Sequence, residues 1–302
     1  MACKKVFAGY NGDLLFSVCS VGEKSMKLLI RSTLRHFLTA SFAIGLGACA
    51  SNNIYTTGHT ALNDTTLAYA KVGNGSPTIV FQSGLGDGKD TWSSIANPLA
   101  RGSQVFAYDR PGYGDSKELA GSRDPCTIAT ELRTALHQAG VRPPFILVGH
   151  SLGGIYQYAF ARMYPDDVLG MVLIDPTHPR HWEQIQAQSP TLTATMKTLR
   201  LVSFSSTERR EFDDQATCLD RFDLKQGLPI PVKVLFRTEY QRLEQGQLEK
   251  IVKDLQGDWK NITGSDQLLY IQGAGHYVHR DQPLQVISLI SDFRKEVSHQ
   301  SK

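Results

Sequence analysis

FILVGHSLGGIYQYAF, residues 145–160, changes from a short apolar run to a helical repeat across a glycine-rich turn. The run FILVGH predicts a buried strand. Within the turn GHSLG, residues 149–153, both glycines are so crowded by neighbouring backbone that only hydrogen fits as their side chain. Apolar side chains then recur with helical spacing until Pro165 ends the pattern: Leu152, Ile155, Tyr156, Ala159, Phe160 and Met163. The stretch predicts strand, tight turn and helix, with the hydroxyl of Ser151 held outward at the turn.

The same alternation continues along the chain. Further apolar runs predict strands at 67–73, 78–82, 104–109, 171–175, 232–237 and 267–273, and a helix over 125–140. Several runs are almost wholly apolar, as are strands buried on both faces of a parallel sheet. Alternating strands and helices predict an α/β fold with a doubly wound, mostly parallel sheet. Residues 54–73 indicate an antiparallel hairpin joined to that sheet.

One segment, residues 176–231, interrupts the alternation because it holds no convincing strand. HWEQIQAQ (181–188) and TLTATMKTLRLVSF (191–204) are helix-like instead. We expect a helical cap insertion over the carboxyl edge of the sheet, between core segments 54–175 and 232–295. Trp182, Met196, Leu199 and Phe204 are candidate apolar side chains for a pocket under this cap, although core packing explains them equally well.

The glycine–serine turn and further motifs resemble those of the α/β-hydrolase superfamily, over nearly all of residues 54–295. FQSGLGDG (81–88) is similar to the family's oxyanion loop, with Ser83 in place of the usual histidine. YDRPGYGDS (108–116) is similar to the turn after its fourth strand, which we expect Asp109 and Arg110 to brace. GAGHYVHRDQP (273–283) is similar to the loop that carries the catalytic histidine. The resemblance implies an α/β-hydrolase fold and a serine hydrolase.

The resemblance also implies roles for single residues. Ser151 would attack the acyl carbon, and His276 would remove its proton and later protonate the leaving group. The backbone N–H groups of Leu85 and Leu152 would bind the oxyanion. A serine at this turn argues against dehalogenase or epoxide hydrolase chemistry, which in this fold uses an aspartate nucleophile.

The acid that orients His276 has two candidates. The family places it after the seventh strand in most members and after the sixth in some. PVKVLFRTEYQ (231–241) lacks the usual aspartate and offers Glu239, whereas MVLIDPTHP (171–179) has Asp175 at the strand end. We prefer Asp175, because a short side chain fixed at a strand end holds an imidazole with little loss of entropy. Glu239 stays the alternative, and we expect His150 and His279 to pack or to order their loops.

The first 48 residues have the pattern of an export signal. Basic residues precede the uncharged stretch FLTASFAIGLGA (37–48), which is too short to span a bilayer. The following Cys49 completes a resemblance to the bacterial lipobox, so we expect a lipidated cysteine and a protein on the periplasmic face of the outer membrane. A plain signal peptide, with a periplasmic or secreted product, is the alternative. Met26 begins a signal of ordinary shape and is expected to be the true start.

Composition narrows the expected partners. The chain has 302 residues, 41% hydrophobic and 20% charged, which is typical of a globular protein. Its formal net charge is +3, but residues 1–48 contribute +4, so the remainder carries −1 and has no basic excess for nucleic acid. No metal-ligand spacing or phosphate-binding glycine loop is found, and we expect no cofactor or metal. Cys126 and Cys218 could form a disulfide in an exported chain, or stay free and buried.

The sequence therefore predicts a serine hydrolase that cleaves a carboxylic ester of a small-molecule acyl substrate through an acyl-enzyme. Amidase, lactonase, thioesterase and cofactor-free peroxidase activities stay open, because the same site serves them all. The alternative from another class is a non-catalytic envelope lipoprotein that retains the fold. The intact Ser151, His276 and glycine set speaks against it.

Overall fold

A computed structural model of the chain describes residues 56–62 and 64–300. The expected export signal, the expected start at Met26 and the expected lipid site at Cys49 lie outside the described residues. No helix in the described part of the chain combines the length and the apolar character needed to cross a bilayer.

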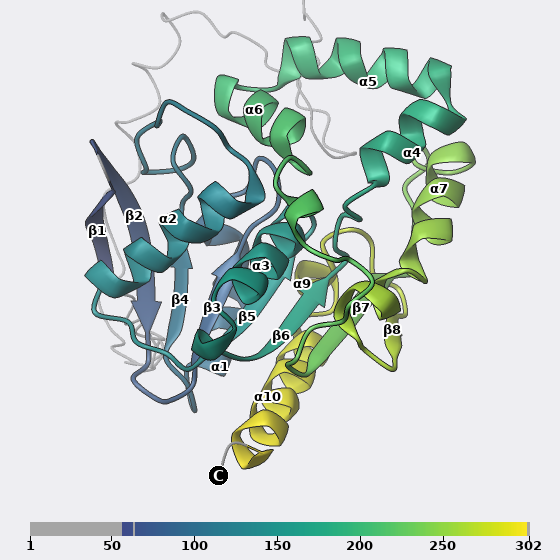
Figure 1. Ribbon diagram of the computed structural model, residues 1–302. Helices are drawn as coiled ribbons and strands as arrows, with labels where there is room; N and C mark the ends of the chain where they lie inside the picture. Colours follow the sequence, from purple (N-terminus) through teal and green to yellow (C-terminus); the bar gives the residue numbers. More distant parts are fainter. Residues whose placement is uncertain (1–55, 63, 301–302) are drawn as a thin grey trace, which may run out of the picture. The chain divides into compact units, whose positions relative to one another are not determined.

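Eight strands form one sheet in the order β1-β2-β4-β3-β5-β6-β7-β8 (Figure 1). β1 pairs with β2, and β2 with β4, in antiparallel fashion, whereas every pair from β4 to β8 is parallel. The predicted hairpin and the mostly parallel α/β sheet are thereby confirmed. The strands are β1 (Thr56–Leu62), β2 (Thr65–Val72), β3 (Thr78–Gln82), β4 (Val105–Tyr108), β5 (Phe145–His150), β6 (Val168–Ile174), β7 (Val232–Arg237) and β8 (Leu268–Ile271).

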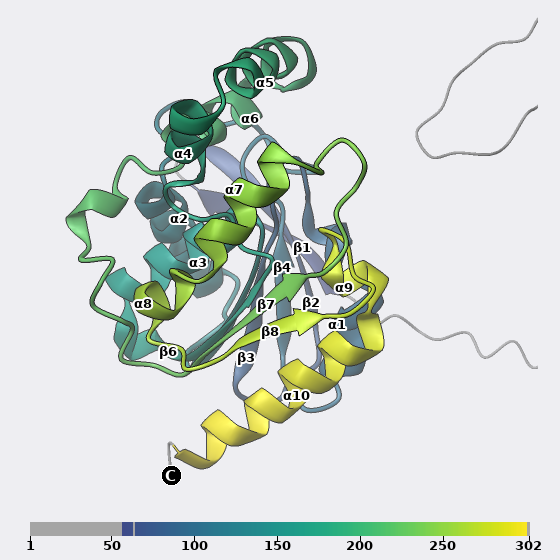
Figure 2. The ribbon, with the colours of Figure 1, turned by 90° about the vertical axis from the view of Figure 1, so that its right-hand side faces the viewer.

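Helices cover both faces of the sheet (Figure 2). α2, α3 and α8 contribute to the apolar core on one face, and α1, α9 and α10 to the core on the other. A further group, α4 to α7, lies beyond the carboxyl ends of the parallel strands (Figure 1). The helices are α1 (Ser93–Leu99), α2 (Pro125–Gln138), α3 (Leu152–Met163), α4 (His181–Gln188), α5 (Pro190–Ser203), α6 (Ser206–Asp214), α7 (Gln247–Gln256), α8 (Trp259–Thr263), α9 (Val278–Asp281) and α10 (Pro283–Gln300).

The central strand β5 shows why its sequence is apolar at every position but the last two. Phe145 and Leu147 lie in the core with α2 and α3, and Ile146 and Val148 lie in the core with α1 and α10. Alternate side chains of a strand point to opposite faces, so a sheet covered on both sides needs apolar residues at both sets of positions. This two-sided burial fixes the strand in place and presents its carboxyl end, with the following turn, to the open edge of the sheet.

The cap has a more complex origin than the sequence predicts. Residues 176–231 contain α4, α5 and α6 and no strand, as expected. However, α7 belongs to the segment after β7 and packs against α4. Two separate excursions of the chain, one after β6 and one after β7, therefore cover the carboxyl edge of the sheet.

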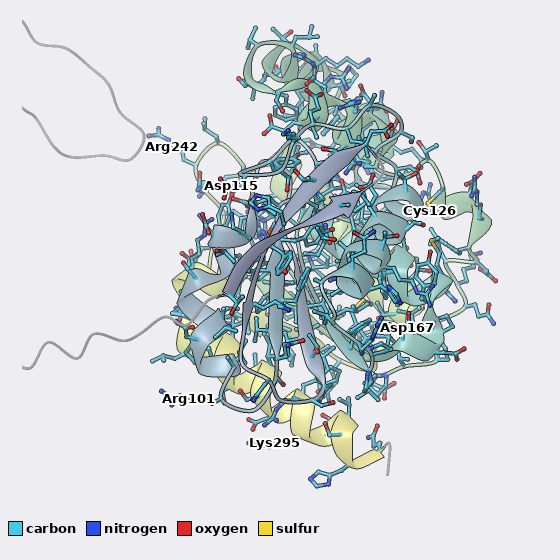
Figure 3. The ribbon with its side chains drawn as sticks, turned by 90° about the vertical axis from the view of Figure 1, so that its left-hand side faces the viewer. Arg101, Asp115, Cys126, Asp167, Arg242 and Lys295 are labelled. Carbon is cyan, nitrogen blue, oxygen red and sulfur yellow. A yellow bond between two sulfur atoms is a disulfide. The ribbon has the colours of Figure 1, made fainter. Side chains whose placement is uncertain are left out.

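A disulfide joins the first of these excursions to the core. Cys126 lies in the first turn of α2 (Figure 3), and its sulfur is bonded to that of Cys218, which follows α6. The two cysteines are 92 residues apart in the sequence. Of the two alternatives that the sequence leaves open for this pair, the structure contains the disulfide.

Candidate active site

Ser151 occupies a strained turn between β5 and α3. Its backbone has φ 53° and ψ −124°, a conformation that residues other than glycine rarely adopt. A Cβ on Gly149 would lie 2.6 Å from the carbonyl oxygen of Gly153, and one on Gly153 would lie 2.3 Å from that of Gln82. Both glycines are therefore required by the close approach of backbone, as the tight turn predicts, and the crowding fixes the direction of the serine side chain.

The serine hydroxyl meets a histidine and a carboxylate in line. Ser151 Oγ lies 3.0 Å from Nε2 of His276, and Nδ1 of the same ring lies 2.6 Å from Oδ2 of Asp175. A carboxylate only accepts hydrogen bonds, so Nδ1 carries the proton and Nε2 is left free to accept the serine proton. Asp175 is buried while His276 is about one-third exposed, at 32%. The arrangement can therefore move a proton from the hydroxyl to the ring.

Asp175 is fixed to the end of β6 by its own backbone. Its N–H donates to the carbonyl of Leu235 on β7 at 2.7 Å, and its φ is +43°. Its carboxylate also forms an ion pair with Nε of Arg237, at 3.2 Å. Glu239, the alternative acid, is exposed and its N–H donates to the carbonyl of Ala274. The structure thus brings Asp175 to the imidazole, and the side chain of Glu239 makes no hydrogen bond to it.

Two further histidines support the loop that carries His276. Nε2–H of His150 donates to the carbonyl oxygen of His276 at 2.8 Å, and the ring packs against the His276 and His279 rings. His279 stacks on Trp92 and contacts the hydroxyl of Thr91. Burial holds the pKa of His150 well below its usual value and lowers the pKa of His279 to about 3. Both rings are therefore neutral. As expected from the sequence, His150 packs beside the nucleophile and His279 orders its loop.

The two residues expected to supply the oxyanion donors lie beside the same space. Leu85 and Leu152 line the cavity that contains Ser151 and His276. Among the hydrogen bonds of the loops, turns and caps in residues 56–62 and 64–300, none is donated by either N–H. Ser83, which replaces the family's histidine, accepts a hydrogen bond from Trp92 Nε1 and donates one to the carbonyl of Gly88, each at 2.9 Å. The hydroxyl of Ser83 therefore holds the oxyanion loop in place.

Asp109 and Arg110 both contact the turn that the sequence expects them to brace. Asp109 holds the turn as expected: its carboxylate accepts from the N–H groups of Lys89 and Asp115 at 2.6 and 3.0 Å. A Cβ on Gly114 would lie 2.3 Å from this carboxylate. The guanidinium of Arg110 packs over the ring of Tyr113 in the turn, at 4.6 Å from the ring centre, and it also reaches the oxyanion loop and the cap. The contacts of Arg110 with the oxyanion loop and the cap were not predicted, because turn spacing in a sequence does not reveal a partner that is remote along the chain.

A cavity of about 260 Å³ opens beside the serine. The cap, α7 and the strand ends all contribute to its walls. Of the four apolar residues suggested by the sequence, Met196 and Phe204 line it, whereas Leu199 is mostly exposed and Trp182 packs against the lining residue Phe212. The apolar lining consists of Leu85, Leu152, Pro176, Met196, Phe204, Phe212, Phe236, Leu248, Val252, Leu255 and Trp259.

The cavity also has polar residues that the sequence does not single out. His181 lies in the wall, and burial lowers its pKa to about 4, so it is neutral. Arg237 and Glu244 form an ion pair at 2.7 Å there. No motif marks these residues, because α4 and the loop before α7 come together only in the folded chain. A weak signal exists for Arg237 alone, since a charged residue ends the apolar strand β7.

Within the described ranges, the side chains that could approach a common metal ion are Asp124, Cys126 and Cys218. The two sulfurs are already joined to each other in the disulfide, so neither is a thiolate ligand. The expectation of a reaction without metal or cofactor stays a prediction.

Comparisons with known proteins place the chain in a family. The family model described as "alpha/beta hydrolase fold" matches residues 77–283. The Bacillus subtilis (strain 168) protein YqjL is 25% identical over 220 residues, which cover 70% of this chain and 81% of YqjL. The matches to the next two curated relatives cover only 34% and 23% of the length of those proteins. The solved structure of epoxide hydrolase CorEH has a TM-score of 0.60 at 20% identity, over 80% of this chain and 99% of that chain. A structure described as an N-acyl homoserine lactone degrading enzyme has a TM-score of 0.57 at 19% identity, over 78% of this chain and 100% of that chain.

These two structural matches agree with the observed fold. The family match covers the oxyanion loop, the serine turn, Asp175 and the loop of His276. It supports a hydrolase activity of some kind. The chain belongs to the α/β-hydrolase family.

Proposed function

We propose that this protein is a serine hydrolase that cleaves a carboxylic ester through an acyl-enzyme. The observation that carries the proposal is the line from Ser151 Oγ through the ring of His276 to Asp175, with contacts of 3.0 and 2.6 Å, in the wall of a largely apolar cavity. A hydroxyl, a base and an acid that orients the base are the parts that acyl transfer requires.

In the first half of the reaction, Ser151 Oγ attacks the ester carbon while Nε2 of His276 takes the hydroxyl proton. Asp175 keeps the proton on Nδ1 and stabilises the imidazolium that forms. The negative oxygen of the tetrahedral intermediate accepts from the N–H groups of Leu85 and Leu152. The second of these lies at the amino end of α3, where the helix dipole favours negative charge. Collapse of the intermediate expels the alcohol, protonated by His276, and leaves the acyl group on Ser151.

The second half repeats these steps with water. His276 removes a proton from the attacking water, and the acid leaves as the ring returns its proton to Ser151 Oγ. The cavity would hold the acyl or the alcohol part of the substrate. Its apolar wall and its volume of about 260 Å³ favour a small, uncharged, mainly hydrocarbon group.

Epoxide hydrolysis, the activity named for one structural neighbour, is not the proposal. The group next to the histidine base is a hydroxyl in this chain, and an aspartate is the nucleophile for epoxides in this fold. Lactonase, amidase, thioesterase and peroxidase activities use the same site and remain alternatives within the proposal.

The test is a series of p-nitrophenyl esters of increasing acyl length, combined with labelling by a fluorophosphonate probe. We expect saturable hydrolysis and stoichiometric labelling of the wild type, and neither with Ser151→Ala. A folded wild-type protein that fails to react with the probe, beside an esterase that reacts, would instead favour a non-catalytic protein that retains the fold.

We also propose that Cys49 carries a lipid that anchors the protein in the bacterial cell envelope. The support is the sequence pattern of residues 37–49 alone. Cys49→Ser should move the protein from the membrane to the soluble fraction of fractionated cells. Unchanged membrane association of this variant would contradict the anchor.

A further inference from the structure

We propose that Glu211, on the cap helix α6, acts through Arg110 as a positioning residue for the oxyanion loop. The inference rests on the proposed function, since it concerns the same oxyanion. It adds a residue that lies outside the nucleophile, base and acid, and that comes from the cap rather than the core.

Arg110 holds two consecutive carbonyl groups of the oxyanion loop. Its Nη1 donates to the carbonyl oxygen of Ser83 at 2.7 Å, and its Nη2 donates to that of Gly84 at 2.8 Å. The guanidinium is buried, at 1% exposure, and its planar shape holds both carbonyls at a fixed separation. The loop therefore cannot rotate these peptide groups without losing charge-assisted hydrogen bonds.

The geometry of the peptide bond carries this restraint to the expected oxyanion donor. The carbonyl of Gly84 and the N–H of Leu85 belong to one planar, trans peptide group, so they point in opposite directions. When Arg110 binds the Gly84 oxygen on one side, the Leu85 N–H must point to the other side. Gly84 lies against the nucleophile there, because a Cβ on it would be 3.1 Å from Cβ of Ser151. Arg110 thus aims the donor without touching the substrate.

Glu211 in turn fixes Arg110. Its two carboxylate oxygens accept from Nε and Nη2 of Arg110 at 2.8 and 2.9 Å, and one of them also accepts from the hydroxyl of Tyr113 at 2.8 Å. Glu211 is fully buried, at 0% exposure. Burial alone would lower the pKa of Arg110, but the carboxylate of Glu211 raises it well above its usual value. Arg110 is therefore charged, and its geometry is determined from both sides.

The same turn of α6 also forms a wall of the cavity. Phe212, the next residue, lines the cavity beside Phe204 and Gln215. Correct seating of α6 on the core therefore sets two things together: the space for the substrate and the direction of the oxyanion donor. A role in stability alone would link Glu211 to folding but not to the rate of the chemical step.

The chain offers a matched control in the same network. Arg123 and Glu131 form a second buried ion pair, at 2.6 Å, and Arg123 also lies 3.8 Å from Glu211. Among the hydrogen bonds of the described residues, neither Arg123 nor Glu131 makes one to residues 83–85. Glu131→Gln thus disturbs a buried pair of the same kind without acting on the loop.

The experiment measures the rate constant of fluorophosphonate labelling, together with kcat and KM for the best p-nitrophenyl ester. Removal of one oxyanion donor costs about 10²–10³-fold in kcat, so a misaligned donor should cost about 10- to 100-fold. We expect this loss in labelling rate and kcat for Glu211→Gln, with KM within about twofold of wild type. Glu131→Gln should keep all three values within about threefold. Arg110→Lys keeps the cation but cannot bridge both carbonyls, so we expect it to show the same loss of rate.

Circular dichroism and urea unfolding verify that each variant is folded. If Glu211→Gln does not fold, the double variant Arg110→Met/Glu211→Leu removes both charges together, which buried pairs often tolerate, and it should show the same loss. Equal labelling rates for wild type and a folded Glu211 variant would overturn the proposal. So would an equal loss in Glu131→Gln, or a loss confined to KM. A wild type that the probe never labels contradicts the proposed function itself, which is a different result.

Discussion

At the scale of single residues, the choice between Asp175 and Glu239 depended on where each strand ends. Both candidate acids lie between the serine and the histidine along the chain. In the structure, the short side chain of Asp175 meets the imidazole directly from the end of β6, while Glu239 lies past the end of β7 and is exposed. The sequence could indicate the favoured residue because strand-end position is local. It could not indicate the ion pair with Arg237, which depends on the pairing of β6 with β7.

The role of Asp175 is testable with isosteric substitutions. Asp175→Asn should lower kcat by about 10⁴-fold, because an amide favours the wrong tautomer of His276. Glu239→Gln should change kcat by less than about threefold. Steady-state kinetics with the same ester measure both effects. Full activity of Asp175→Asn together with a large loss in Glu239→Gln would show that Glu239 is the acid that orients His276.

The buried histidines make stability depend on pH. In the unfolded chain His150 and His279 bind a proton near pH 6.5, whereas in the folded chain burial depresses both pKa values, that of His279 to about 3. As the pH falls below about 6.5, the unfolded chain takes up protons that the folded chain does not. The free energy of unfolding should therefore decrease by up to about 1.4 kcal/mol per pH unit for each ring, and recover above pH 6.5.

Urea unfolding between pH 8 and pH 5 measures this dependence, before most carboxylates titrate. His279→Gln should reduce the slope of the unfolding free energy against pH by the amount that corresponds to about one proton. A wild-type stability that is flat across this range would contradict the assignment of neutral buried rings.

At the scale of helices and strands, local sequence predicts the sheet better than the cap. β3, β5 and β7 begin and end where their apolar runs do, and the Ser151 turn leads into α3 as its spacing indicates. The predicted 171–175 strand is less well bounded, since β6 begins at Val168. The cap is harder to predict because α5 buries little. Thr193 is its one buried residue, so the apolar residues of α5 do not indicate which side faces the core. Its pocket-facing side follows from tertiary packing alone.

Two residues on α5 test which side of this helix faces the substrate. Met196 lines the cavity, and Leu199, one turn later, is 54% exposed. Met196→Trp fills part of the cavity and should lower kcat/KM for long acyl chains at least about tenfold more than for acetate, because overpacking excludes the longer group. Leu199→Trp should leave the chain-length profile unchanged. Identical profiles for the two variants would mean that α5 does not form this wall.

At the scale of the whole described fold, the cavity unites segments that are remote in the sequence. Leu85 precedes β4, Met196 belongs to the first excursion, and Leu248 on α7 belongs to the second. Fold class and the serine turn are local or periodic features and could be predicted. The lining of the cavity could not, because it depends on how two excursions pack on each other.

The disulfide between Cys126 and Cys218 fixes the first excursion to the core across 92 residues. A closed loop of this length restricts the unfolded chain strongly, so its removal should cost about 2–5 kcal/mol. Cys126→Ala/Cys218→Ala should lower the urea midpoint, and the wild type should lose its resistance to urea to the same extent when reduced. A mass that does not rise by about 2 Da on reduction would show that the bond is absent from the purified protein.

The backbone of Ser151 has a consequence for how this protein evolves. A non-glycine residue at positive φ costs on the order of 1–3 kcal/mol, and glycine there costs only about 0.5–1 kcal/mol in chain entropy. Replacement of Ser151 by glycine would therefore stabilise the fold while it abolishes the hydroxyl. Without selection for the hydroxyl, stability alone should therefore favour the replacement of this serine by glycine. If the proposed function holds, glycine at position 151 in a related chain should mark a protein that has lost this activity.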